Sequence, residues 1–188
     1  MTQPVTYTIN KRKLSLIQGD ITLQETDGIV NAANPGLMGG GGVDGAIHRA
    51  GGPAILEECR RIVAKQGRLP PGQAVITTAG RMKTSRVIHT VGPIWEGGND
   101  KEAETLASAY RESLKLAAGN NLESVSFPSV STGVYGYPVE KAARIALKTA
   151  ADFLARETPV KEVVFVLYDA RTYDVYASAL REIIAEKQ

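Results

Sequence analysis

The chain has 188 residues, of which 43% are hydrophobic and 22% are charged, a composition typical of a soluble globular domain that can bury a sizeable core. Because 22 basic residues balance 20 acidic ones, the formal net charge is only +2, which argues against a nucleic-acid-binding or membrane-binding surface. The single cysteine, Cys59, excludes a disulfide within the chain, and we expect neither a secretory signal nor a membrane helix, which needs about 20 consecutive apolar residues. These features predict one domain over residues 1–188 in a reducing cytoplasm.

The elements predicted before residue 70 are a hairpin, one buried strand and two helices. Residues 10–12 suit a hairpin turn, because strand-like residues lie on both sides of them. The longer helix carries Leu56, Cys59 and Val63 on one face, so we interpret Cys59 as a core residue rather than a nucleophile. In chain order, these elements are strands at 5–9, 14–18 and 29–33, and helices at about 43–50 and from 53 onward.

The rest of the chain alternates strands with helices. In chain order, we predict strands at 74–79 and 86–91, a helix at 103–117, a strand at 124–127, a helix at 139–154, a strand at 162–167 and a helix at 173–184. This alternation predicts an α/β fold with a mostly parallel sheet and helices on both faces. In such sheets, ligands bind beyond the carboxyl ends of the strands.

A glycine-rich loop lies between the predicted strand at 29–33 and the short helix that follows. Four consecutive glycines, residues 39–42, bring no side chain and cost backbone entropy, so they suit a place where the backbone approaches a ligand closely. Backbone N–H groups at a helix N-terminus are a ready site for phosphate. The alternative is a mobile surface loop. The polar side chains of Asn34 and Asp44 at its two edges favour a ligand.

General nucleotide-binding motifs do not explain this loop. The sequence has no GxxxxGK[ST] motif, which excludes the mononucleotide loop of common ATPases. Gly40, Gly42 and Gly45 match GxGxxG by spacing, but the dinucleotide fold also needs a following strand that ends in an acidic residue. Here that region is a predicted helix with Glu57 and Glu58 inside it, so we reject a dehydrogenase.

A second polar, glycine-bearing loop follows the strand at 124–127 and spans residues 129–137. Its glycines and hydroxyls offer further hydrogen-bond donors, and two such loops suit a ligand with two phosphates. Tyr135 offers an aromatic face that can stack on a sugar or base, and the alternative is that Tyr135 and Tyr137 simply cover the end of the sheet.

Other polar residues follow predicted strands at the same edge. Asp20 can accept a hydrogen bond from the exocyclic amine of a base, or it can cap the turn at Thr22. Tyr168 is a candidate wall of the pocket, and Asp169 is more simply the N-cap of the last helix.

Seven short motifs cover nearly the whole chain in order: Gly19-Asp20-Ile21-Thr22, Ile29 to Asn34, Gly39 to His48, Val87 to Pro93, Phe127-Pro128, Ser131 to Pro138 and Tyr168-Asp169. On these motifs the chain resembles macrodomains of the MacroD type, and especially the bacterial O-acetyl-ADP-ribose deacetylases. The resemblance implies a three-layer α/β/α domain with a central mixed, mostly parallel sheet that binds ADP-ribose in a cleft. It also implies hydrolysis of an ester on the distal ribose, either of O-acetyl-ADP-ribose or of ADP-ribose attached to an acidic residue of a protein.

Residue roles follow from the resemblance. Asp20 is expected to bind the adenine amine with Ile21 beside it, and Tyr168 to line the adenine end. Asn34 and Asp44 are the expected catalytic residues, with Asn34 bound to the distal ribose and Asp44 as the catalytic acidic residue. The family often has Phe at the position of Tyr135, so the hydroxyl of Tyr135 is not expected to be essential. The remaining ligand-binding positions are Ala33, Gly41, Gly42, Val43, Ser131, Thr132, Gly133, Val134, Tyr135 and Gly136.

Ester hydrolysis needs a positioned water more than a protein nucleophile. His48 and His89 lie in helix and strand patterns, so the sequence offers no catalytic triad. It also shows no Cys/His cluster, so we predict no metal and no cofactor. Asp44 can hold or deprotonate the water, but a carboxylate of ordinary pKa, about 4, is a weak base, and proximity would have to supply much of the effect. His48, four residues after Asp44, is interpreted as a packing or capping residue.

Three alternatives to this esterase stay open. Some macrodomains read ADP-ribose without cutting it, although the pair of Asn34 and Asp44 favours an enzyme. A related bacterial class is associated with inhibition of ribonuclease III, and a phosphatase acting on ADP-ribose 1″-phosphate is a weaker alternative. The expected partners are ADP-ribose, O-acetyl-ADP-ribose and ADP-ribosylated proteins, and the expected oligomeric state is a monomer.

Overall fold

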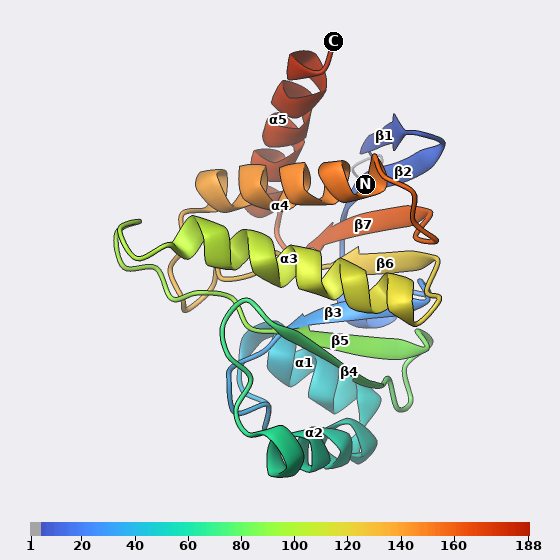
Figure 1. The fold of residues 1–188 in the computed structure, drawn as a ribbon, viewed down its shortest axis with the longest axis vertical. Coiled ribbons are helices and arrows are strands. Elements are labelled where there is room, and N and C mark those ends of the chain that lie inside the picture. The colour runs from blue at the N-terminus through green and yellow to red at the C-terminus, as the bar shows by residue number, and fades with distance from the viewer. Residues whose placement is uncertain (1–4) are drawn as a thin grey trace.

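The structure is a computed structural model that describes residues 5–188, and this part of the chain forms one seven-stranded sheet (Figure 1). Across the sheet the strand order is β1-β2-β7-β6-β3-β5-β4. The five central strands, β2, β7, β6, β3 and β5, are parallel, whereas β1 and β4 pair antiparallel at the two edges. The strands are β1 (Val5–Ile9), β2 (Arg12–Gln18), β3 (Gly28–Ala32), β4 (Ala74–Thr78), β5 (Arg86–Thr90), β6 (Ser124–Phe127) and β7 (Glu162–Leu167).

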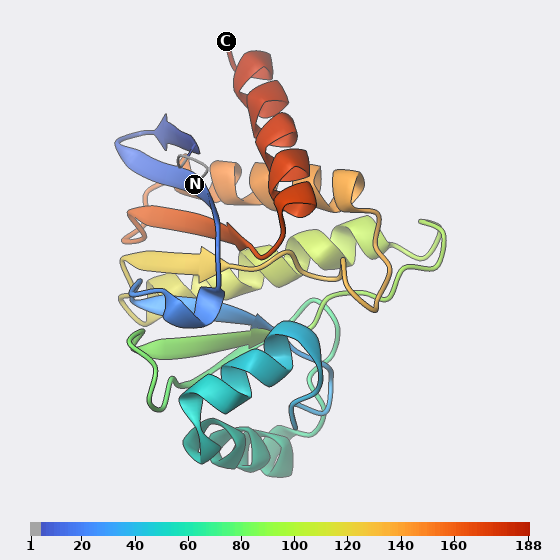
Figure 2. The same cartoon turned by 180° about the vertical axis from the view of Figure 1, so that it is seen from behind.

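Helices cover both faces of the sheet, which confirms the expected three-layer α/β/α fold. In Figure 1, α3 and α4 lie in front of the sheet, and the view from behind in Figure 2 brings α1 and α2 forward. The C-terminal helix α5 packs beside α4 and against β2. The helices are α1 (Gly42–Gly51), α2 (Pro53–Gln66), α3 (Glu102–Gly119), α4 (Val139–Leu154) and α5 (Ala170–Glu186), and a short 3₁₀ turn, η1, spans Ile21–Leu23.

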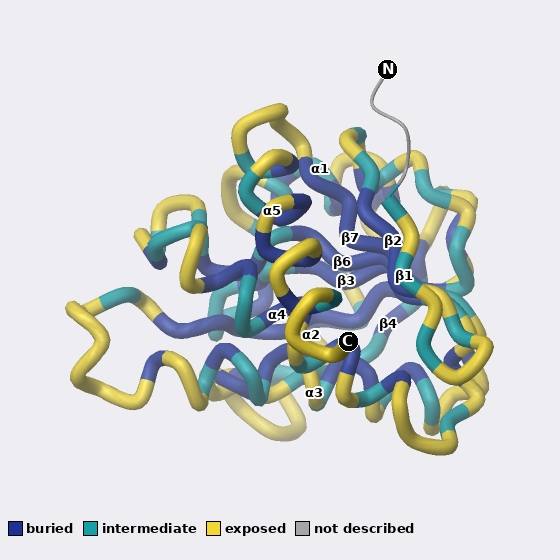
Figure 3. Tube along the Cα trace, turned by 90° about the horizontal axis from the view of Figure 1, so that it is seen from above, coloured by how far each residue is buried: buried dark blue, intermediate teal, exposed yellow. Residues whose placement is uncertain are grey.

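Two hydrophobic clusters form the core, one on each face of the sheet. In β7, Val163 and Phe165 belong to the cluster under α3, α4 and α5, and Val164 and Val166 belong to the cluster on the opposite face. Side chains of a strand alternate between the two faces, so a strand with helices on both sides is apolar at every position. The central strands are accordingly dark blue in Figure 3, and exposure concentrates in the loops and on the outer faces of the helices.

Most predicted elements agree with the structure to within three residues, and two details were wrong. Arg12, predicted in the hairpin turn, begins β2 and pairs with Ile9, because Asn10 and Lys11 alone make the turn with φ of 47° and 68°. The buried side of α2 carries Ile55 rather than Leu56, which is only half-buried. Cys59 is buried in the core, as predicted.

The parallel strands bring distant segments together at one edge of the sheet. The segments that follow β2, β7, β6 and β3 begin at neighbouring carboxyl ends, in that order across the sheet. The predicted site residues lie in or just after these four segments. None of the described helices is long and apolar enough to cross a membrane.

Candidate active site

The glycine loop after β3 leads into α1 with an uncapped N-terminus. Gly41 is the N-cap residue and offers no side chain, so the first N–H groups of α1 have no side-chain cap. Gly39 and Gly42 adopt φ of 87° and 58°, which a residue with a side chain rarely adopts. A Cβ atom at Gly41 or Gly42 would meet no atom within 4 Å, so the backbone faces open space here. The loop therefore presents donors of the kind that bind phosphate.

Asn34 and Asp44, the two predicted catalytic residues, flank the same glycine. The Asn34 Nδ2 donates to Gly39 O at 3.0 Å and thereby fixes the loop. A Cβ atom at Gly40 would lie 3.3 Å from Asp44 Oδ2 and 3.4 Å from Asn34 Nδ2. The absence of a side chain at Gly40 therefore keeps a small space between an amide and a carboxylate. Gly45 is needed for a different reason, because its Cβ atom would collide with Gly40 O.

The second loop, residues 129–137, presents another run of free donors. Within residues 5–188, the backbone N–H groups of residues 131–135 have no intramolecular acceptor. Ser131 adopts φ of 68°, its Oγ is buried, and no hydrogen-bond partner for this atom lies within the described chain. The loop is held from behind, since Val130 N donates to Tyr110 Oη at 2.9 Å and Trp95 N donates to Tyr135 O at 2.8 Å. The loop therefore suits an anion, because consecutive backbone N–H groups can bind an anion without charged side chains.

Three tyrosines follow the strand ends at this edge of the sheet. One of them lies in the core, and the other two are accessible to a ligand. Tyr137 is buried and packs on Trp95 with 4.6 Å between ring centroids, so it covers the sheet end, as the alternative interpretation had it. Tyr135 is half-buried and Tyr168 is 83% exposed, so both have ring surface for a ligand. Asp169 caps α5 by accepting from Thr172 N at 2.8 Å, as predicted, and this bond lowers its pKa.

Asp20 lies at the end of β2, close to the position that Tyr168 takes after β7. Gly19 N donates to Leu167 O at 3.0 Å, which joins the ends of these strands. Asp20 Oδ1 accepts from Thr22 N at 2.9 Å and from Thr22 Oγ1 at 2.7 Å, so the capping interpretation is confirmed. The other carboxylate oxygen, Oδ2, receives no donor from the described chain, so capping leaves one oxygen for a ligand. Ile21 is buried and anchors the turn.

The remaining predicted positions differ mainly in exposure. Ala33 is buried and donates its N–H to Thr90 O at 2.9 Å. Val43 and Thr132 are half-buried, whereas the side chain of Val134 is fully exposed. A Cβ atom at Gly133 or at Gly136 would meet open space, as at Gly41 and Gly42.

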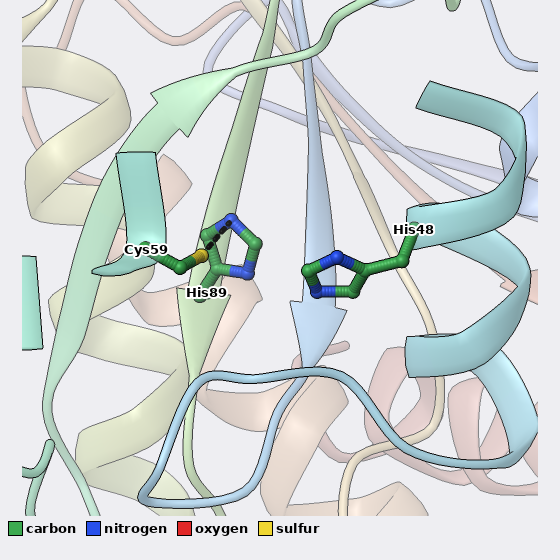
Figure 4. A group of neighbouring side chains, drawn as sticks. All are labelled: His48, Cys59 and His89. Atoms are coloured by element: carbon green, nitrogen blue, oxygen red, sulfur yellow. Dashed lines mark hydrogen bonds between the residues drawn. The ribbon is translucent and has the colours of Figure 1, made fainter. Parts of the chain in front are cut away.

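Sequence reasoning missed a polar cluster buried beneath Asp44. His48 on α1, Cys59 on α2 and His89 on β5 place nitrogen and sulfur atoms within 4.8 Å of one another (Figure 4). The expectation that no Cys/His cluster exists was therefore wrong, because these residues are far apart in sequence and meet only when α1 and α2 pack on the sheet. Sequence reasoning also assigned no role to Asn31. The one feature that could have drawn attention to it is that it is a polar residue inside an apolar strand.

The cluster is hydrogen-bonded in a way that does not favour a metal. Both ring nitrogens of His89 already have partners, Asn31 Nδ2 at 3.1 Å and Thr77 Oγ1 at 2.8 Å. Burial, together with the nearby Asp44 and Glu58 carboxylates, raises the pKa of the Cys59 thiol to about 11, so the thiolate that metals bind is disfavoured. The absence of a metal stays a prediction.

Asp44 is buried between this cluster and the glycine loop. Its Oδ1 accepts from Asn31 Nδ2 at 2.8 Å and lies 3.4 Å from His48 Nε2. His48 packs over Gly39, as predicted of a packing residue. Asp44 Oδ2 faces Gly40, so the carboxylate has one oxygen toward the protein interior and one toward the loop. Such an oxygen is placed to hold a water against a ligand seated on the loop.

Comparisons with known proteins identify the family of this chain. The family model of the Macro domain matches residues 30–146. The chain is 58% identical to an O-acetyl-ADP-ribose deacetylase of Klebsiella pneumoniae (strain 342) over 165 residues, which are 88% of this chain and 94% of that protein. It is 59% identical to a macro domain-containing protein of Caldanaerobacter subterraneus subsp. tengcongensis, over 92% of this chain and 98% of that one.

Solved structures show the same fold with nucleotides bound. The Oceanobacillus iheyensis macrodomain with ADP is 44% identical, with a TM-score of 0.94 over 98% of both chains. The Trypanosoma brucei macrodomain in complex with ADP-ribose is 39% identical, with a TM-score of 0.81 over 89% of this chain and 68% of that one. On its sequence, its fold and its paired glycine loops, this chain belongs to the macro domain family.

Proposed function

We propose that this protein binds ADP-ribose and hydrolyses the ester of O-acetyl-ADP-ribose. The observation that carries the proposal is the placement of Asn34 and Asp44 on either side of Gly40, at the mouth of a loop with uncapped N–H donors. The names of the relatives support it, since several proteins 54–58% identical over most of this chain are O-acetyl-ADP-ribose deacetylases.

The order of features along the sheet edge matches the order of groups in ADP-ribose. Asp20 and Tyr168 follow β2 and β7, the loop of residues 131–136 follows β6, and the glycine loop follows β3. Adenine would lie against Asp20 and Tyr168, the diphosphate between the two sets of N–H donors, and the distal ribose beside Asn34 and Asp44. In this assignment each group of the ligand lies beside backbone or side-chain groups of matching chemistry.

Ester cleavage then needs one water at Asp44. A water held by Asp44 Oδ2 gives one proton to this carboxylate and adds to the carbonyl carbon of the acetyl group, and the bond from this carbon to the ribose oxygen breaks. The ribose oxygen keeps the electron pair and takes the proton back from Asp44, so the products are ADP-ribose and acetic acid, which releases its proton to give acetate. Asn34 orients the ribose, and positioning supplies much of the acceleration that a weak carboxylate base lacks.

The test compares wild type with Asp44→Ala. We expect turnover of O-acetyl-ADP-ribose to fall by about 10²–10⁴-fold, the range for loss of a general base, while calorimetry shows ADP-ribose still bound. Asp174→Ala, at an exposed position on α5, is the matched control and should change neither quantity. Tight ADP-ribose binding with no turnover in the wild type would refute the enzyme and leave a reader module.

The broader roles stay predictions of the sequence. These are removal of mono-ADP-ribose from acidic residues of proteins, regulation of ribonuclease III, a monomeric state and a cytoplasmic location. Activity of the wild type on a protein ADP-ribosylated at glutamate would support the first, and a pull-down unaffected by Asp44→Ala would separate the second from catalysis.

A further inference from the structure

A chain of hydrogen bonds runs from Asp44 across three strands to the edge of the sheet. Asp44 on α1 contacts Asn31 on β3, Asn31 contacts His89 on β5, and His89 contacts Thr77 on β4. Asn31 and His89 are directly paired in the parallel ladder, so the sheet itself sets their spacing. The side chains of Asn31, His89 and Thr77 are all fully buried. None of the three is among the residues that the proposed function uses.

We propose that His89 and Thr77 are positioning residues, which hold the Asp44 carboxylate in its active orientation through the amide of Asn31. The inference rests on the proposed catalytic role of Asp44. Asn31, His89 and Thr77 are here called the buried row. Packing alone does not explain the row, because apolar residues would fill the same positions without needing hydrogen bonds.

The donors and acceptors of the row fit one arrangement of protons. The Asn31 Nδ2 group has two hydrogens, and it donates one to Asp44 Oδ1 at 2.8 Å and the other to His89 Nδ1 at 3.1 Å. His89 Nδ1 must then carry a lone pair, so its proton is on Nε2 and is donated to Thr77 Oγ1 at 2.8 Å. The hydroxyl of Thr77 in turn donates to Thr78 O at 2.9 Å. A flipped Asn31 amide would instead set its oxygen against the Asp44 carboxylate, which can only accept.

A neutral His89 is required for this arrangement. Burial, and to a smaller extent the neighbouring His48, lowers the pKa of His89 to about 4, although the Asp44 carboxylate acts in the opposite direction. The imidazole is therefore neutral at neutral pH, and one of its nitrogens accepts. If Thr77 loses its hydroxyl, His89 Nε2 keeps only the weaker and more distant partner Cys59 Sγ at 3.9 Å, so the tautomer that accepts from Asn31 is less strongly favoured.

The predicted consequence is slower turnover with unchanged binding. Only Asp44 Oδ1 touches the row, whereas Oδ2 faces Gly40 and the ligand. A loosened Asn31 would let the carboxylate rotate, so the water would lose its position. The donors of the two loops do not depend on the row, so ADP-ribose affinity should stay the same.

The experiment uses two Thr→Val variants that remove equally buried hydroxyls. Thr77→Val breaks the row, and Thr90→Val removes the hydroxyl that donates to Gln73 O at 2.9 Å, away from Asp44. We expect Thr77→Val to lower kcat on O-acetyl-ADP-ribose by about tenfold, the scale of one hydrogen bond, with KM and the Kd of ADP-ribose within about twofold of wild type. Thr77→Ser should restore kcat, and Thr90→Val should leave it within about twofold. Equal kcat losses in Thr77→Val and Thr90→Val would overturn the proposal.

A second measurement does not depend on activity. Nitrogen NMR of the histidines in wild type should show His89 neutral with its proton on Nε2, and Thr77→Val should raise the Nδ1-protonated form. A wild-type His89 protonated on Nδ1 would overturn the proposal even if the enzyme is active. An inactive wild type whose His89 carries its proton on Nε2 would instead refute the proposed function while leaving the row in place, so the two failures are distinguishable.

Discussion

His89 should make the stability of this protein depend on pH in a window that few other groups share. Its pKa falls from an ordinary 6.5 to about 4 in the folded state, mainly because the imidazole is fully buried. Well above pH 6.5 the imidazole is neutral in both the folded and the unfolded state, so it contributes no pH dependence there. As the pH falls from 6.5 toward 4, the unfolded chain binds a proton that the folded chain does not, so the free energy of unfolding decreases.

The size of this decrease follows from the shift. One pKa unit corresponds to 1.36 kcal/mol, so the free energy of unfolding should fall by about 2 kcal/mol between pH 7 and pH 5 and by about 3 kcal/mol by pH 4. The range from pH 7 to pH 5 tests His89 more cleanly than the range below pH 5. Carboxylates such as Asp169, whose pKa is lowered by its capping bond, begin to contribute as the pH approaches their ordinary values.

The assay is urea unfolding at pH 7, 6 and 5, followed by the fluorescence of Trp95. The comparison is with His89→Asn, whose amide oxygen can still accept from Asn31 but does not titrate. We expect the variant to be less stable at pH 7 and to lose about 2 kcal/mol less than wild type on going to pH 5. Parallel pH dependences in the two proteins would refute a neutral buried His89.

Three further predictions concern the ligand site. Asp20→Ala should weaken ADP-ribose binding by about 1–3 kcal/mol, the scale of a hydrogen bond to a charged group, whereas unchanged affinity in calorimetry would remove Asp20 from the site. Gly40→Ala places a methyl group 3.3 Å from Asp44 Oδ2 and 3.4 Å from Asn34 Nδ2, so turnover should fall. Gly119→Ala, where the added methyl meets open space, is its control, and equal rates in both variants would contradict the geometry. Tyr135→Phe should keep its turnover, because the expected role of Tyr135 is ring packing, and a loss of tenfold or more would assign its hydroxyl a role.

The ligand loops were predictable because their signals are local. Asn34, the four glycines and Asp44 lie within eleven consecutive positions, and a glycine run before a helix has few structural uses besides close approach. The uncapped N-terminus of α1 and the φ values of Gly39 and Gly42 agree with that expectation.

The face of α2 shows where local pattern becomes insufficient. Two apolar stripes share Cys59, one through Leu56 and Val63 and the other through Ile55 and Ile62, and periodicity fits both. The structure buries Ile55, which packs directly against Gly51 of α1. Which of the two stripes is buried depends on how α1 and α2 pack together, so the pattern of α2 alone cannot predict it.

The buried row beneath Asp44 lay beyond sequence reasoning for the same reason. Asn31, Thr77 and His89 belong to three strands, and they become neighbours only through the order β3-β5-β4. Asn31 is the one polar residue of β3, whereas Thr77 and His89 lie next to other polar residues in β4 and β5, so the sequence gives no reason to group the three. Their mutual hydrogen bonds become visible only when the register pairs Asn31 with His89.

The energetics of this row favour a functional origin. Burying three polar side chains stabilises a fold less than burying apolar ones of similar size, and an unsatisfied buried acceptor costs about 1–3 kcal/mol. Here the row leaves Asn31 Oδ1 with no hydrogen-bond partner within the described residues, so the sheet does not recover the full cost. The row begins at Asp44, the buried carboxylate beside the open space of the glycine loop. A fold selected for stability alone would fill these positions with aliphatic side chains, so the polar row is best explained by what it does to Asp44.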